Sequence, residues 1–146
     1  NIIGMETLGL RMERVCNNAF RLAQALEKLE GVSVNYPLLE SSPYHELAEK
    51  QLSGKGGAIL TIRAGSKERA YKLINHLKYV KIATNIGDVR TLVIHPASTI
   101  YIHSTPEAMA EAGVYDDTIR ISVGIEDIKD LIQDFTEAVE SLILSA

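Results

Sequence analysis

The chain has 146 residues, of which 46% are hydrophobic and 23% are charged, and its formal net charge is −4. This length suits one well-packed domain and is too short for two ordinary ones. A mildly acidic chain without a basic run gives no electrostatic reason to expect nucleic acid or an anionic membrane as a partner.

The single cysteine, Cys16, excludes an intrachain disulfide and a multi-cysteine metal site, which suits a reducing cytoplasm. No stretch approaches the roughly 20 apolar residues of a membrane span, and the start lacks the order of a signal peptide. The sequence begins with Asn1 rather than Met and runs directly into helix-like sequence. We therefore expect it to be a piece of a longer protein.

Apolar residues near the start recur in alternating steps of four and three, which predicts one long amphipathic helix that Gly31 ends. The apolar stripe of this helix consists of Leu8, Met12, Val15, Ala19, Leu22, Leu26 and Leu29.

A short strand follows, with Val32, Val34 and Tyr36 alternating along it. Ser42 before Pro43 then predicts an N-cap and a first helical position, which open a short helix.

The glycine-rich stretch Gly54-Lys-Gly-Gly57 is predicted to be a flexible turn. A phosphate loop would need Gly-Lys-Ser/Thr between a strand and a helix, whereas these glycines precede a strand at Ala58 to Arg63. Ser66 is predicted to cap the next helix, whose apolar face consists of Ala70, Leu73, Ile74 and Leu77.

Residues 79–83 and 91–94 predict two strands around a short polar loop, Thr84-Asn-Ile-Gly-Asp88. A short helix around Glu107 to Ala112 then ends at Gly113.

The histidines do not predict a metal centre. His45 is expected to be a surface or packing residue, because no second ligand lies at helical spacing from it. His95 and His103 would need a third ligand, and the sequence offers none at an obvious spacing.

The last strand carries the residue that most resembles a ligand contact. Ile119, Ile121 and Val123 should face one way, while Arg120 and Ser122 face the other. The planar fork of Arg120 matches a carboxylate in a bidentate way. On spacing alone, a solvated arginine or a structural ion pair remains an alternative.

Gly124 is expected to turn the chain, with Glu126 and Asp127 in the first turn of the final helix, where the macrodipole favours acids. The apolar face of that helix consists of Ile128, Leu131, Ile132, Phe135, Val139 and Leu142. Together these elements predict a single α/β two-layer sandwich: a mixed, largely antiparallel sheet with helices packed on one face.

Several segments, in order along the chain, together match a known family: Gly4-Met-Glu-Thr-Leu-Gly-Leu-Arg-Met-Glu-Arg14, Asn18-Ala19, Tyr36-Pro37, Pro43-Tyr-His-Glu-Leu-Ala48, Gly56-Gly57, Asn85-Ile-Gly-Asp88, His95-Pro-Ala-Ser-Thr99, Ala112-Gly-Val114 and Arg120-Ile-Ser-Val-Gly-Ile-Glu126. Through these segments the chain resembles, essentially from end to end, the C-terminal part of the pyridoxal-phosphate (PLP) enzymes of cysteine and methionine metabolism. This resemblance implies that residues 1–146 form the small C-terminal domain of a fold-type I PLP-dependent transferase, with residues 1–30 as a long domain-linking helix.

The resemblance also implies roles for single residues. Arg120 matches the arginine that grips the substrate α-carboxylate, and Asn85 matches the loop position that helps to hold it. The loop itself looks like the Asn-Val-Gly-Asp form of the O-acetylhomoserine sulfhydrylases. Ile100 and Tyr101 stand where the family usually has Thr-His, and with Thr84 they are candidate pocket-lining residues.

By the same resemblance, the Schiff-base lysine and the groups that hold PLP belong to a large N-terminal domain, so this chain alone is expected to hold no cofactor and no catalytic residue. The parent would be a cytoplasmic O-acetylhomoserine sulfhydrylase that replaces acetate by sulfide to form homocysteine. Its implied partners are an amino-acid substrate, its own N-terminal domain and further copies of itself in a tetramer. The alternatives are a cystathionine γ-synthase or methionine γ-lyase of the same family, or a non-catalytic amino-acid-binding or assembly module.

Overall fold

The computed structural model describes residues 2–143, so Asn1, the first residue of the predicted domain-linking helix, lies outside the described residues. Its helices are α1 (Ile2–Glu6), α2 (Leu8–Leu26), α3 (His45–Leu52), α4 (Lys67–His76), α5 (Pro106–Glu111) and α6 (Ile128–Ile143), with a 3-10 turn η1 (Pro96–Ser98). The strands are β1 (Ser33–Asn35), β2 (Ile59–Arg63), β3 (Lys81–Ile82), β4 (Leu92–Ile94) and β5 (Thr118–Ser122). Within residues 2–143, no helix combines the length and apolarity that a membrane span requires.

The strands form one sheet in the order β1-β2-β5-β4-β3. Strand β2 pairs antiparallel with β1 and with β5, and β5 pairs antiparallel with β4. Only the short pairing of β3 with β4 is parallel among the described strands. The predicted mixed, largely antiparallel sheet is confirmed.

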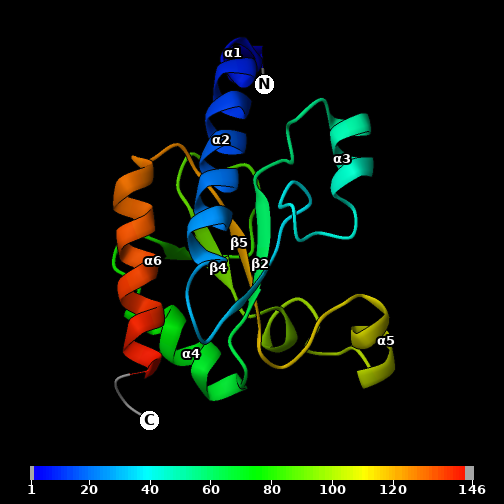
Figure 1. Cartoon of the computed structure of the whole chain (residues 1–146), viewed down its shortest axis with the longest axis vertical. Coiled ribbons are helices and arrows are strands. Elements are labelled where there is room, and N and C mark those ends of the chain that lie inside the picture. The colour runs from blue at the N-terminus through cyan, green and yellow to red at the C-terminus, as the bar shows by residue number, and fades with distance from the viewer. Residues whose placement is uncertain (1, 144–146) are drawn as a thin grey trace.

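The three longest helices, α2, α4 and α6, lie together over one face of the sheet (Figure 1). Ile119 and Ile121 of β5 are fully buried and share one apolar core with Phe135 of α6. Truncating a buried phenylalanine to alanine typically costs about 3–5 kcal/mol, so this layer of side chains holds the helices to the sheet. The two-layer arrangement predicted from the sequence is confirmed.

Tyr36, directly after β1, explains why the turn before β2 has a glycine at position 56. Its side chain is fully buried, its ring stacks on Phe20 at 6.3 Å, and its hydroxyl donates to the carbonyl oxygen of Gly57 at 2.9 Å. Burial raises the pKa of this hydroxyl well above its ordinary value. A Cβ on Gly56 would come within 2.7 Å of the tyrosine ring, so the close approach requires glycine there.

The predicted first helix differs from the observed one at both ends. Thr7 leaves helical geometry, with φ −105° and ψ 4°, and so separates α1 from α2. At the other end α2 stops at Leu26, and tighter turns continue the chain before Gly31 reverses it with φ 89°. The glycine therefore marks the turn into β1 rather than the last turn of the helix.

The two predicted N-caps have different outcomes. Ser66 accepts from the backbone N–H of Arg69 at 3.2 Å, which confirms it as the cap of α4. The prediction for Ser42 was wrong, because α3 begins at His45. Its hydroxyl accepts from the N–H of Tyr44 at 3.2 Å and so closes a turn that precedes the helix.

Candidate functional site

Arg120 lies in the middle of β5, on the face of the sheet opposite α2, α4 and α6. The antiparallel register places it across from Thr61 of β2 and Ile94 of β4, and Thr61 lies across from Asn35 of β1. Residues directly opposite each other in such pairs project from the same face. Asn35, Thr61, Arg120 and Ile94 therefore form one row across four strands.

The guanidinium of Arg120 reaches the loop between β3 and β4. Its Nη2 donates to the carbonyl oxygen of Asn85 at 2.9 Å and to that of Thr84 at 3.5 Å. The predicted site residues thus come together, but through the loop backbone. The Asn85 side chain is turned back on its own loop, where its Oδ1 accepts from the N–H of Ile86 at 2.9 Å.

One nitrogen of the Arg120 guanidinium is buried and makes no hydrogen bond with the described residues. Its Nε has no hydrogen-bond partner among residues 2–143, although the residue as a whole is only half-buried. An unpaired buried donor costs about 1–3 kcal/mol, and more when the group is charged. An anionic acceptor that approaches from the solvent side would therefore meet the terminal nitrogens of the guanidinium and not Nε, and it would offset part of the cost of the buried charge.

Arg120 lines a pocket of about 320 Å³ on the open face of the sheet. Two predicted pocket residues, Ile100 and Tyr101, belong to its wall, whereas Thr84 and Asn85 lie outside its lining. The remaining lining residues are Asn35, Thr61, Pro96, Ala112, Gly113, Val114 and Thr118.

Sequence reasoning missed Asn35, Thr61 and Thr118, which bring polar groups to the floor of this pocket. Asn35 Nδ2 donates to the hydroxyl of Thr61 at 3.4 Å. A polar residue at alternate positions of a strand is an ordinary signal for a solvated face, so nothing in the local pattern distinguishes these residues.

The turn after β5 is fixed by contacts with two other parts of the chain. The buried Asn18 of α2 donates from Nδ2 to the carbonyl oxygens of Gly124 at 3.0 Å and Glu126 at 2.9 Å. A Cβ on Gly124 would lie 2.4 Å from the carbonyl oxygen of Val89, so this approach of the two loops requires glycine. The strand that carries Arg120 is thereby held to α2 and to the loop before β4.

The prediction that Glu126 and Asp127 occupy the first turn of the last helix was wrong, because α6 begins at Ile128. The carboxylate of Glu126 accepts from both the N–H and the hydroxyl of Thr91. Asp127 directly precedes the helix and accepts from the N–H of Lys129 at 2.8 Å. Glu126 therefore ties the turn to β4 instead of balancing the helix dipole.

The loop that meets Arg120 is closed at its far end by Asp88. Its Oδ1 accepts from the backbone N–H of Arg90 at 2.9 Å, and the Arg90 Nε lies 3.5 Å from the same oxygen. The backbone hydrogen bond, with the Arg90 charge as a smaller cause, lowers the pKa of the Asp88 carboxyl below its ordinary value.

The structure gives His95 and His103 surroundings that do not suit a metal centre. Both ring nitrogens of the buried His95 are engaged, Nδ1 with the Ser98 hydroxyl at 2.9 Å and Nε2 with the Asp116 carbonyl at 2.7 Å, while His103 is exposed. Across residues 2–143, no group of three or more His, Cys, Asp or Glu side chains is arranged to hold a metal ion.

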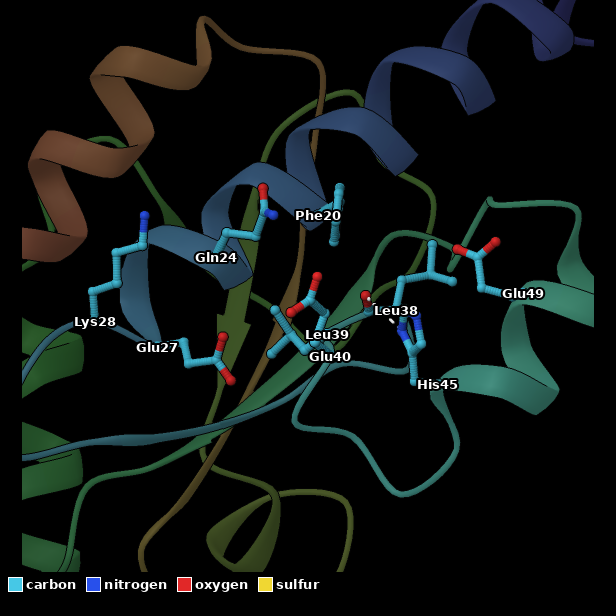
Figure 2. Close-up of a pocket in the computed structure, with 9 residues that line it drawn as sticks. All are labelled: Phe20, Gln24, Glu27, Lys28, Leu38, Leu39, Glu40, His45 and Glu49. Carbon is cyan, nitrogen blue, oxygen red and sulfur yellow. Dashed lines mark hydrogen bonds between the residues drawn. The ribbon is translucent and has the colours of Figure 1, made fainter.

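A second cavity, of about 250 Å³, lies between α2 and the segment that leads into α3 (Figure 2). His45 hydrogen-bonds through Nδ1 to the carbonyl oxygen of Leu38 at 3.2 Å. Three glutamates and one lysine line this cavity: Glu27, Glu40, Glu49 and Lys28. Because carboxylates dominate the lining, this cavity should repel a carboxylate ligand. The Arg120 pocket, by contrast, suits such a ligand.

Comparison with known proteins places these features in context. The model of the family described as Cys/Met metabolism PLP-dependent enzyme matches residues 2–140. The chain is 48% identical to the homocysteine synthase of Schizosaccharomyces pombe, covering 94% of this chain and 32% of that protein. It is 45% identical to O-acetyl-L-homoserine sulfhydrylase 1 of Thermus thermophilus, covering 94% of this chain and 33% of that protein.

Among solved structures, the chain superposes with a TM-score of 0.90 on a Campylobacter jejuni protein described as O-acetylhomoserine (thiol)-lyase, which contains N′-pyridoxyl-lysine-5′-monophosphate. The two are 36% identical, and the match covers 94% of this chain and 33% of that one. The chain thus spans about a third of the length of the curated relatives it matches.

Proposed function

The chain belongs to the family of Cys/Met metabolism PLP-dependent enzymes, and from that membership we propose that it is the substrate-side domain of an O-acetylhomoserine sulfhydrylase. In this reaction the bond from Cγ to the acetate oxygen breaks, a bond from Cγ to sulfur forms, and acetate leaves as homocysteine is made. The task of this domain is to bind and orient the amino-acid substrate.

The observation that carries the proposal is the state of the Arg120 guanidinium. It is anchored through Nη2 to the Asn85 carbonyl, it carries a buried Nε without a partner among the described residues, and it borders an open pocket. A substrate α-carboxylate in this pocket would contact the terminal nitrogens of the guanidinium, because the buried Nε is out of reach from the solvent. Holding that carboxylate in a fixed orientation determines which bonds of Cα are presented to the reacting centre.

The other predicted substrate contacts support Arg120 in this proposal. Thr84 and Asn85 set the position of the guanidinium through their carbonyl oxygens, and Asn85 also helps to define the carboxylate subsite. Ile100 and Tyr101 form the wall of the pocket next to Arg120. Their replacement of a family Thr-His pair makes this wall more apolar at Ile100.

The residues around Arg120 do not by themselves fit the cofactor. No lysine and no carboxylate lines the Arg120 pocket among the described residues, so it lacks the groups that PLP binding requires. We therefore assign PLP binding to the remainder of the parent protein.

The parent's N-terminal domain is the proposed partner for the exposed apolar surface of α1 and the start of α2. Ile2, Ile3, Met5 and Leu10 there are 77%, 82%, 69% and 71% exposed. Exposed apolar patches of this kind mark interaction surfaces. The proposal further places the parent in the cytoplasm, as a homo-oligomer.

The test uses the full-length protein with PLP, O-acetylhomoserine and sulfide, and follows homocysteine formation against release of a 2-keto acid. Arg120→Ala should lower kcat/KM about 100-fold, because a charge-assisted contact is worth roughly 1.5–3 kcal/mol and each 1.4 kcal/mol is tenfold. Arg120→Lys keeps the charge without the fork and should recover only part of the loss.

Lys129→Gln, which removes one positive charge on α6, is the matched control and should leave kcat/KM unchanged. Unchanged kcat/KM in Arg120→Ala would remove this residue from the site. Keto-acid release without homocysteine would favour the lyase alternative, and amino-acid binding without any product would favour the non-catalytic module.

A further inference from the structure

The loop that meets Arg120, residues 84–90, is held to the rest of the domain mainly at its two ends. Within residues 2–143, the hydrogen bonds that join residues 84–88 to segments outside this loop all come from Arg120 Nη2. A hollow of about 170 Å³ separates Ile86 from Leu8 and Met12 of α2. Packing on that side does not fix the middle of the loop, so its position depends on the two ends.

The end of the loop that enters β4 is fixed by Thr91, which is fully buried. Its N–H and its hydroxyl both donate to the Glu126 carboxylate, the hydroxyl at 2.9 Å. The same hydroxyl accepts from the N–H of Gly124 at 3.0 Å, and the Thr91 carbonyl accepts from the N–H of Lys81 at 3.1 Å. Every polar group of Thr91 is therefore engaged, and two of its bonds are strengthened by the charge of the acceptor.

The turn that carries Glu126 packs tightly against this end of the loop. The N–H of Ile125 donates to the carbonyl oxygen of Val89 at 2.9 Å. A Cβ on Gly124 would lie 2.5 Å from Glu126 Oε2 and 2.4 Å from the Val89 carbonyl oxygen. Because no space separates the carboxylate, the turn and the loop end, a change at Thr91 or Glu126 should displace the loop.

The antiparallel register connects this contact to the arginine. Thr91 directly precedes the β4–β5 ladder, and Glu126 follows that ladder at the same end. From there the loop extends back over β5, where the Asn85 carbonyl oxygen lies 2.9 Å from Arg120 Nη2. The guanidinium is thus held at its base by β5 and at its tip by a loop whose end Thr91 and Glu126 fix.

We propose that Thr91 and Glu126 are positioning residues for the substrate contact of Arg120. Neither residue lines the Arg120 pocket. Their contact fixes the end of the loop, and the carbonyl oxygens of Thr84 and Asn85 then fix the guanidinium. The inference rests on the proposed function, because Arg120 is the group that is positioned.

Kinetics of the full-length protein with O-acetylhomoserine and sulfide test this role. Thr91→Val keeps the shape of the side chain and removes its hydroxyl. It should raise KM for O-acetylhomoserine about tenfold with kcat nearly unchanged, since a misplacement of about 1 Å costs up to about 100-fold. Glu126→Gln should act in the same direction, because the amide offers one acceptor atom in place of two. Thr91→Ser keeps the hydroxyl and should restore KM to within about twofold of wild type.

A double-mutant cycle with Arg120 separates positioning from a general structural role. If Thr91 acts through Arg120, Thr91→Val should lower kcat/KM little further in a protein that already carries Arg120→Ala. Ser66→Ala is the matched control, because it removes a hydroxyl acceptor at the start of α4, and it should leave kcat/KM unchanged. Additive losses in the cycle, or an equal loss in Thr91→Ser, would overturn the proposal.

Hydrogen exchange of the full-length protein, followed by mass spectrometry, needs no turnover and separates the inference from the proposed function. Thr91→Val and Arg120→Ala should each increase exchange in residues 84–91, because each removes one anchor of the loop, whereas Ser66→Ala should not. If Thr91→Val does not fold, Glu126→Gln is the second variant.

Unchanged exchange in residues 84–91 of the folded variants would overturn the proposal even in an enzyme that converts O-acetylhomoserine. Increased exchange in Thr91→Val and Arg120→Ala, with no further increase when the two are combined, would support it. The same result in a protein that does not convert O-acetylhomoserine would leave the positioning pair standing and remove the sulfhydrylase.

Discussion

Replacing Asn18 by alanine tests how the turn after β5 is held. Asn18 is 1% exposed, and its Nδ2 donates to the carbonyl oxygens of Gly124 and Glu126. Alanine removes the donor and leaves the buried Gly124 carbonyl without this partner, at about 1–3 kcal/mol, whereas the Glu126 carbonyl keeps the Nη2 of Arg14 at 3.1 Å. Because only one acceptor loses its partner, we expect Asn18→Ala to lower the free energy of unfolding by about 1–3 kcal/mol.

The matched control is Asn17→Ala at the neighbouring exposed position. Alanine is the better helix former, so this variant should be neutral or slightly stabilising. Urea denaturation of both variants, followed by circular dichroism, gives the comparison. A loss below about 1 kcal/mol for Asn18→Ala, or an equal loss in the control, would refute the claim that these hydrogen bonds hold the turn.

Three further predictions concern packing, pH and surface. Gly56→Ala should destabilise the chain by about 1–3 kcal/mol, because the new methyl would meet the Tyr36 ring at 2.7 Å; an unchanged urea midpoint would contradict this. The backbone N–H of Arg90 lowers the pKa of Asp88 in the folded state. The ionised carboxylate should therefore stabilise the fold above pH 3.8, the ordinary pKa of the group, and this stabilisation should be lost as the pH falls through the folded-state pKa. The difference in Tm between wild type and Asp88→Asn should therefore vanish in acid, and a difference that grows on acidification would reverse the sign of the argument. Leu10→Ser removes an apolar side chain that is 71% exposed and should reduce self-association of the isolated chain in light scattering, whereas a wild-type chain that is already monomeric at high concentration would contradict the patch.

The parts of the fold that depend on local pattern could be predicted from the sequence. Alternation along Ile119, Arg120 and Ile121 placed the arginine on the face opposite the helices, because the period of a strand is fixed by its backbone geometry. The N-cap at Ser66 could also be predicted, because the first N–H groups of a helix need a side-chain acceptor close by in the sequence.

The parts that depend on distant pairings could not. Asn18 meets Gly124 across 106 positions, and no local period reports such a contact. Glu126 was assigned to the helix dipole because its neighbours in sequence suggested a helix start, whereas its carboxylate is taken by Thr91, 35 positions earlier. The row that joins Asn35 and Thr61 to Arg120 likewise depends on strand order, which only the assembled sheet defines.

The double hydrogen bond from Asn18 has a mechanical consequence. These bonds hold the middle of α2 to the end of the strand that carries Arg120, so we expect the helix and the strand to move together as one rigid unit. Thr7, with its non-helical backbone and no side-chain cap, separates α1 from α2, and Arg11 spans this break by donating to the carbonyl oxygen of Gly4 and to the hydroxyl of Thr7. We expect any bend between α1 and α2 to fall at Thr7. Such a bend would change the position of Arg120 relative to its substrate without deforming the sheet.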